Sequence, residues 1–238
     1  MRYLQIRREY QHHEYLDMVF VDPYAQLISP LLTKLCLRLG LIPNAVTVCM
    51  IVFGLIGAGL FAAPYLICRI AGVVFIHLWY IADCSDGEVA RITKKFSRFG
   101  TQIDYTAHII NHPLFVFAFT LALVGALGPE YAVWVCLTGF AVAALDLAFR
   151  CLVIFDDIYR ERMAEPGSAR PASPSRLKRV IRYFINIFLH LPNFCLIFPL
   201  VFFVSPFAGF VYMLAVMCVN ALMVAYHALK WLMKIINK

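Results

Sequence analysis

Charged residues are scarce in this sequence, and their scarcity excludes an ordinary soluble domain. Only 15% of the 238 residues are Asp, Glu, Lys or Arg, whereas 62% are hydrophobic. Soluble domains carry about 25% charged and about 45–50% apolar residues. The apolar residues come in blocks of about 20, the length that a helix needs to cross the hydrocarbon core. Because these blocks lack the alternation of a membrane barrel, the sequence predicts an all-α integral membrane protein.

Further absences narrow the class of function. The eight cysteines form no close CxxC pair and lie mostly in apolar runs, which favours small buried side chains over disulfides or a zinc site. Residues 1–16 lack the apolar core of a signal peptide. No RNA- or DNA-binding motif is present, so we attribute the net charge of +7 to the cytoplasmic loops of a membrane protein rather than to nucleic-acid binding.

Six transmembrane helices are expected, preceded by an interfacial amphipathic helix. The amphipathic segment runs from Asp17 to Leu41, where leucines recur at helical spacing. The expected spans cover about residues 44–63, 66–82, 102–127, 131–155, 180–204 and 207–233. The chain therefore divides into a cytoplasmic N-terminal tail with the interfacial helix, residues 1–43, and one six-helix transmembrane domain, residues 44–238.

The distribution of basic residues predicts the orientation. The connection after the second span carries four Lys or Arg, and the charged stretch 156–179, expected to be a cytoplasmic loop, carries six. The connections on the opposite side are short and almost without basic residues. By the positive-inside rule, both termini and the polar stretch between the second and third spans face the cytoplasm.

That polar stretch contains a cluster of acidic residues. Asp83 and Asp86 are three residues apart, and Asp104 and His108 are four apart, so each pair shares one helix face. Antiparallel packing of the two helices would bring the four side chains together. Three carboxylates at membrane depth are costly unless a cation compensates them, and Mg²⁺ or Mn²⁺ with a substrate phosphate would do so. The alternative is a set of interfacial charges satisfied by nearby arginines and water.

The spacing of this cluster resembles the CDP-alcohol phosphotransferase signature, D-x2-D-G-x2-A-R-x8-G-x3-D-x3-D. Seven of its eight fixed positions match: Asp83, Asp86, Gly87, Ala90, Arg91, Gly100 and Asp104. Residues 43–47, Pro-Asn-Ala-Val-Thr, are also similar to the family's P-N-x-x-T at the start of the first span. The resemblance implies a phospholipid-synthesis enzyme that moves a phospho-alcohol or phosphatidyl group from a CDP-linked alcohol or CDP-diacylglycerol to a hydroxyl acceptor, releasing CMP. The acceptor would be a lipid or small alcohol, and a homodimer is common in the family.

The resemblance also assigns roles to individual residues. The metal ligands for Mg²⁺ or Mn²⁺ would be Asp83, Asp86, Asp104 and His108. The residues that bind CDP would be Asn44, Thr47, Gly87, Arg91, Ser97 and Gly100. Arg91 would neutralise the diphosphate, and the small residues would let the second and third spans close around the nucleotide. Capping of the first helix is an alternative role for Asn44 and Thr47.

The last position of the motif departs from the family pattern. His108 stands where relatives have an aspartate, taken to be both a metal ligand and the base that deprotonates the acceptor. Histidine suits either task, but it lacks the negative charge that helps hold a second metal. Three interpretations follow: His108 is a working catalytic base, it is an altered ligand with the base elsewhere, or activity is lost. In the last case the chain would bind CDP-lipid or act as a membrane assembly partner.

A few polar residues lie outside the motif. His112 is one turn beyond His108 and either orients it or is simply a packed helix histidine. Asp146 and Arg150 are four apart in the fourth span; either Arg150 holds an anionic acceptor or the two form a self-satisfied ion pair. Hydrogen bonding between helices is favoured over cavity lining for Asn186, His190 and Asn193 of the fifth span.

Overall fold

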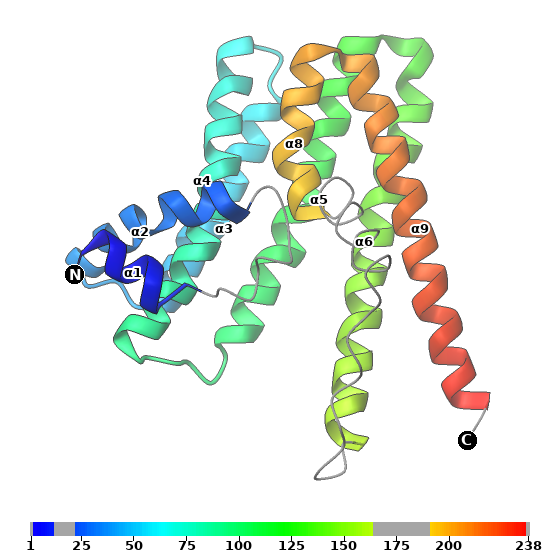
Figure 1. Cartoon of the computed structure of the whole chain (residues 1–238). Coiled ribbons are helices and arrows are strands. Elements are labelled where there is room, and N and C mark those ends of the chain that lie inside the picture. The colour runs from blue at the N-terminus through cyan, green and yellow to red at the C-terminus, as the bar shows by residue number, and fades with distance from the viewer. Residues whose placement is uncertain (1, 12–21, 164–190, 237–238) are drawn as a thin grey trace.

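The computed structural model describes residues 2–11, 22–163 and 191–236, and its regular secondary structure there is all helical (Figure 1). The helices are α1 (Tyr3–Glu9), α2 (Asp22–Arg38), α3 (Pro43–Ala62), α4 (Leu66–Thr93), α5 (Gly100–Leu127), α6 (Pro129–Met163), α8 (Leu191–Val204) and α9 (Pro206–Ile236). The all-α prediction is therefore confirmed for the described part of the chain.

The described helices include five that are long and apolar enough to cross a membrane, and each matches an expected span. They are Pro43–Ala62, Leu66–Thr93, Gly100–Leu127, Pro129–Phe155 and Pro206–Met233. The remaining expected span, 180–204, is represented by the short apolar helix α8, and its first part lies outside the described residues. A sixth span is thus not confirmed.

Two helices extend further than the apolar runs suggested. α4 was expected to end as a span near residue 82, but the helix continues through the acidic cluster to Thr93, and Lys94 follows in a left-handed conformation with φ 54°. α6 continues to Met163, so the expectation of a loop beginning at residue 156 is wrong for residues 156–163. That stretch, DDIYRERM, contains no glycine or proline to break the helix. Residues 164–179 lie outside the described part.

The amphipathic helix predicted before the first span is present as α2. In Figure 1 it lies crosswise to the long helices, beside α1, at the end of the bundle where α4 and α5 are joined. Ser29 and Thr33 are fully buried on one face, whereas Leu27, Leu31 and Leu35 are exposed on another. An apolar face on a helix across the end of a bundle suits a position at the membrane surface. Residues 17–21 of the expected segment are not described.

Helix α3 packs against both α4 and α5, and glycines bring it close to each. A Cβ built at Gly72 of α4 would lie 2.7 Å from the backbone nitrogen of Phe61, and one at Gly54 would lie 2.4 Å from the side chain of Asn111. Glycine at these two positions therefore lets the helices approach closely. Gly59 does not share this role, because a Cβ there would have no atom within 4 Å.

Aromatic side chains form the core where α3, α5 and α8 meet. Phe61, Phe119, Phe194 and Phe198 are all fully buried. The rings of Phe119 and Phe198 stack with centroids 4.3 Å apart and planes 18° apart. Phe119 lies three turns beyond His108 on the same helix, about 16 Å along the axis. The aromatic core therefore anchors one part of α5, and the polar residues around His108 lie on another part of the same helix.

Gly72→Ala tests the close approach of α3 and α4. The added methyl group would force two backbones apart, so we expect the free energy of unfolding to fall by about 1–3 kcal/mol. Gly59→Ala is the matched control: its methyl group enters open space, and the helix gains about 0.5–1 kcal/mol from the lost flexibility of glycine. Unfolding in detergent measures both, and equal shifts of the two variants would contradict the packing argument.

Candidate active site

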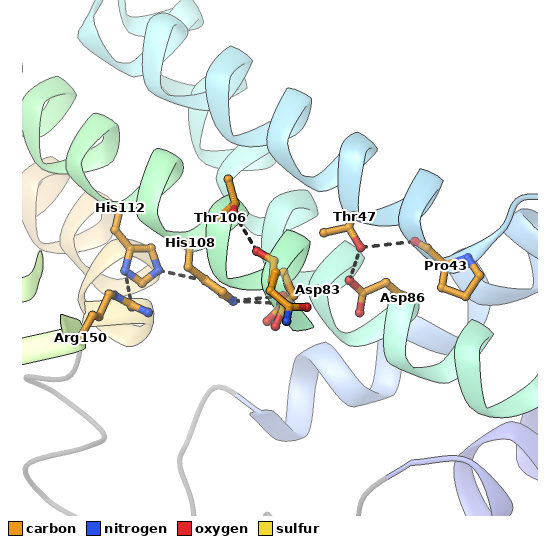
Figure 2. Close-up of polar contacts among 10 residues, drawn as sticks. Pro43, Thr47, Asp83, Asp86, Thr106, His108, His112 and Arg150 are labelled. Atoms are coloured by element: carbon orange, nitrogen blue, oxygen red, sulfur yellow. Dashed lines mark hydrogen bonds and ion pairs between the residues drawn. The ribbon is translucent and has the colours of Figure 1, made fainter. Parts of the chain in front are cut away.

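Asp83 of α4 and Asp104 and His108 of α5 lie together. Nε2 of His108 is 3.3 Å from Oδ1 of Asp83 and 3.5 Å from Oδ1 of Asp104, and Figure 2 shows the imidazole pointing toward Asp83. The prediction that these three residues lie together is confirmed. The expected direct packing of their two helices is not what brings them together. α4 and α5 each pack most closely against α3, and their side chains converge across the space between them.

Trp79 fills part of that space and holds the imidazole. Its fully buried ring meets His108 edge-on, with centroids 5.7 Å apart and planes 87° apart. It also contacts His112 and Phe115 of α5, with centroids 5.5 and 5.1 Å away. Because Trp79 is a large rigid ring packed against His108 and its neighbours on α5, it restricts the orientations that His108 can adopt.

Asp86, the fourth expected metal ligand, is held separately. The hydroxyl of Thr47 donates to Oδ2 of Asp86 at 2.8 Å and also lies 3.3 Å from the carbonyl oxygen of Pro43 (Figure 2). Thr47 therefore ties the start of α3 to the acidic helix. The capping alternative is not supported, because the N-cap of α3 is Ile42 and it makes no side-chain capping bond.

The donor set at Asp83, Asp104 and His108 fits a divalent cation. Each residue offers one ligand atom, and these atoms all lie within 4.8 Å of one another. Oδ1 of Asp104 is buried and has no hydrogen-bond partner among the described residues. Carboxylate oxygens with an imidazole nitrogen suit Mn²⁺, and oxygen-rich sites suit Mg²⁺. This oxygen, whose contact with Nε2 of His108 is 3.5 Å long, is a buried acceptor available to such an ion.

Two adjoining cavities open beside these residues. The larger, of about 630 Å³, is lined by Asp83, Arg91, Asp104 and His108 together with Gln11, Gln26 and Tyr80. The smaller, of about 240 Å³, is lined by Asn44, Thr47, Ser97 and Gly100 with Ala90 and Lys95. Asp86, Gly87, Thr101 and Asp104 line both. All six residues expected to contact CDP thus border one or both cavities; Gln11, Gln26, Tyr80 and Thr101 were not predicted.

The motif glycines keep cavity space open rather than permitting close helix packing. A Cβ at Gly100 would meet only the Cβ of Ser97, at 3.7 Å, and the atoms nearest to one at Gly87 belong to the guanidinium of Arg91, from 3.1 Å. This differs from the expectation that these positions let two helices close on each other. Arg91 is turned toward the N-terminal segment, where its Nε donates to the carbonyl oxygen of Tyr10.

A buried carboxylate that the sequence analysis missed holds α2 against α4. Glu88 is 1% exposed. It accepts hydrogen bonds from the hydroxyls of Ser29 at 2.5 Å and Thr33 at 2.6 Å, and from the amide of Gln11 at 2.8 Å. Glu88 follows Gly87 at a variable position of the motif, so the motif assigned it no role. The available signal was the spacing of Ser29 and Thr33, four residues apart on one face of α2.

A second contact links the same helices nearer the apolar core. The hydroxyl of Tyr24 contacts Nδ1 of His77, and the two rings pack edge-on. Burial raises the pKa of Tyr24 well above its usual range, so this phenol stays neutral at any physiological pH. In addition, the hydroxyl of Ser85 donates to the carbonyl oxygen of Ser29 at 3.2 Å. α2 is thus fixed along its length by polar bonds.

His112, Asp146 and Arg150 form a polar group next to His108. Nε2 of His112 is 3.3 Å from Nδ1 of His108, and Arg150 lies 2.6 Å from the other ring nitrogen of His112 (Figure 2). Nε of Arg150 donates to Asp146 at 3.0 Å. The ion pair expected from the sequence is present, but it is not self-contained. Asn193 of α8 is buried, and Asn186 and His190 lie outside the described residues.

Glu88→Leu tests the attachment of α2. The substitution removes the acceptor of three hydrogen bonds and leaves buried hydroxyls unpaired, which costs about 1–3 kcal/mol for each group. We expect faster hydrogen–deuterium exchange across α2, with α9 unchanged. Thr33→Val is the control of similar shape: it removes one donor while Glu88 keeps two, so its effect should be smaller. Equal exchange in wild type and Glu88→Leu would refute the role of Glu88.

Comparison with known families agrees with this geometry. A family model described as CDP-alcohol phosphatidyltransferase matches residues 40–236, which is most of the chain. No curated protein sequence matches the chain significantly. The matched range contains α3, the helices α4 and α5 that carry the acidic cluster, and the apolar helices that follow. The chain therefore belongs to the CDP-alcohol phosphatidyltransferase family, whose members are metal-dependent enzymes of phospholipid synthesis.

Proposed function

We propose that this protein transfers a phospho-alcohol or phosphatidyl group from a CDP-linked alcohol or CDP-diacylglycerol to an acceptor hydroxyl, releasing CMP. One observation carries the proposal. The acidic cluster and the segment 43–47, far apart in sequence, border a single pair of adjoining cavities. A site for a charged nucleotide beside a site that bears carboxylates and an imidazole supports group transfer better than binding alone.

The smaller cavity suits the CDP moiety. Asn44, Thr47, Ser97 and Gly100 line it, and Gly87 opens it toward the larger cavity. Because Gly87 has no side chain, a ligand can extend from one cavity into the other. Arg91 borders the larger cavity beside Gly87, where its guanidinium can pair with the diphosphate. The acceptor would then enter the larger cavity, next to His108.

Mg²⁺ or Mn²⁺ would be held by Asp83, Asp86 and Asp104, which leaves Nε2 of His108 free to accept a proton. When bound, the ion polarises the diphosphate and stabilises the charge of the departing nucleotide. Thr47 positions Asp86 through its hydrogen bond of 2.8 Å, and Trp79 restricts the ring of His108. These residues thus set the direction of the ligand atoms before substrate arrives.

His108 acts as the base in this proposal. The acceptor O–H bond breaks, its proton goes to Nε2 of His108, and the electron pair stays on the oxygen. That oxygen bonds to the β-phosphorus of the donor as the bond from this phosphorus to CMP breaks, with its electrons leaving on CMP. An imidazole is well suited to accept a proton near neutral pH, and Nε2 points into the carboxylate cluster.

The same proposal extends to the arrangement in the membrane. We place the site and both termini on the cytoplasmic side, where a soluble nucleotide can meet a lipid partner, and α2 at the interface. The segment that ends in α8 supplies the sixth span of a transmembrane domain comprising residues 44–238, after an N-terminal region of residues 1–43. A homodimer agrees with the family's common state. Loss of catalysis would remove the reason to keep three carboxylates at this depth.

Asp86→Asn tests the metal assignment. The amide can still accept from Thr47 but lacks the charge, so we expect CMP release that depends on Mg²⁺ or Mn²⁺ to be abolished. Purified protein with candidate CDP-alcohols and CDP-diacylglycerol provides the assay. Glu130→Gln, at the start of α6 and away from both cavities, removes a carboxylate without this effect. Unchanged turnover in Asp86→Asn would refute the assignment.

His108→Ala tests the base. We expect CMP release to fall by about 10²–10⁴-fold, while binding of CDP, measured by calorimetry, stays close to wild type because the nucleotide residues are intact. His108→Asp restores the family residue and should recover part of the rate. Wild-type turnover in His108→Ala would show that the base lies elsewhere. Nucleotide binding by wild type with no turnover of any donor would instead support a silent homologue.

A further inference from the structure

The ring of His112 is the starting point, because its surroundings determine which nitrogen carries hydrogen. The side chain is fully buried. Nδ1 faces two groups of α6: a terminal guanidinium nitrogen of Arg150 at 2.6 Å and Oδ2 of Asp146 at 3.4 Å. Nε2 faces Nδ1 of His108 at 3.3 Å. At this depth no bulk water can replace these partners, so each ring nitrogen must use the protein group that it faces.

The contact with Arg150 assigns the hydrogens along the chain of contacts. A guanidinium can only donate, so Nδ1 of His112 must accept, and its hydrogen is on Nε2. That N–H donates to Nδ1 of His108, which places the hydrogen of His108 on Nε2. This N–H then faces the carboxylates of Asp83 and Asp104. In this first arrangement Nε2 of His108 has no lone pair for a proton or a cation.

Asp146 supports the opposite arrangement. A carboxylate can only accept, so when Nδ1 of His112 turns to Asp146 the hydrogen of His112 is on Nδ1. Nε2 of His112 then accepts from Nδ1–H of His108, which leaves a lone pair on Nε2 of His108. The number of hydrogens on the two rings is the same in both arrangements, one each. Only the second arrangement allows His108 to act as a base.

We propose that Arg150 and Asp146 compete for Nδ1 of His112 and thereby decide whether Nε2 of His108 carries hydrogen. This inference rests on the proposed function of His108 as base. Arg150, Asp146 and His112 are positioning residues that act through His108. The ion pair between Arg150 and Asp146 keeps both competitors beside the same nitrogen, since separating them would leave the buried carboxylate of Asp146 without its charged partner. Arg150 favours the inactive tautomer, and Asp146 favours the active one.

The two halves of this ion pair should therefore have opposite effects on turnover. Asp146→Asn removes the carboxylate without changing its shape, and we expect kcat to fall by about 10²-fold or more with KM for the CDP-linked donor unchanged. Arg150→Met removes the donor to Nδ1 of His112 and should raise kcat. Arg150→Lys keeps a charged donor, so its kcat should rise less than that of Arg150→Met. In His108→Asp, where no ring is left to orient, Asp146→Asn should cost little further activity.

Several results would overturn the proposal. A purely structural ion pair predicts equal losses of stability and of kcat for Asp146→Asn and Arg150→Met. A role of Arg150 in holding an anionic acceptor predicts that Arg150→Met raises KM for the acceptor and lowers turnover at limiting acceptor. Melting temperature in detergent, measured for every variant, separates unfolding from a change in turnover.

A spectroscopic measurement tests the tautomers without requiring turnover. Protein labelled with ¹⁵N in histidine distinguishes a ring nitrogen that carries hydrogen from one that does not, and His108→Asp and His112→Gln identify the signals. Without added metal, wild type and Asp146→Asn should carry hydrogen on Nε2 of His108, and Arg150→Met should carry it on Nδ1. An unchanged tautomer in Arg150→Met refutes the proposal. If wild type releases no CMP from any donor, the proposed function fails, whereas these spectra still decide the tautomer.

Discussion

The constraint on which this structure depends is the need to compensate carboxylates buried among apolar helices. Each of three such groups has its own donors: Glu88 has Gln11 and two hydroxyls, Asp86 has Thr47, and Asp146 has Arg150. Asp83 and Asp104 depend on one imidazole, and Oδ1 of Asp104, 3.5 Å from that ring, accepts no hydrogen bond from the described residues. Buried polar groups are normally satisfied, so incomplete satisfaction here distinguishes a ligand site from the structural carboxylates around it.

The same polar bonds connect the N-terminal helices to the site. Glu88 holds Gln11 and α2, and Arg91, three residues along α4, donates to the backbone of Tyr10. Gln11 and Gln26 line the larger cavity beside the carboxylates. The N-terminal segment therefore forms a wall of the site and is more than a surface anchor. Because the larger cavity is where the acceptor would enter, this wall is suited to influence which acceptor fits.

The sequence predicted the parts of the fold that depend on local patterns. Apolar runs located α3, α4, α5, α6 and α9, and the spacing of the acidic motif placed Asp83, Asp104 and His108 together. Contacts between residues distant in sequence were not predictable in this way. No local pattern shows that Glu88 faces Ser29, or that Arg150 of α6 contacts His112 of α5. Apolar runs also could not show that α6 continues to Met163, because residues 156–163 are mostly charged and contain no apolar run.

In the proposed reaction, His108 changes both the charge of the site and the group that accepts the proton. An aspartate there would add a fourth carboxylate, whereas a neutral imidazole adds none and brings hydrogen bonds that must be directed. A carboxylate base needs no orientation of this kind, since either oxygen can accept a proton. An imidazole is useful only in one tautomer, and that tautomer is set by what its other nitrogen contacts. If His108 is the base, as proposed, the replacement of aspartate by histidine makes the buried contacts of His112 with α6 part of the reacting site. Among the described residues, His112 with its contacts to Asp146 and Arg150 can meet this requirement.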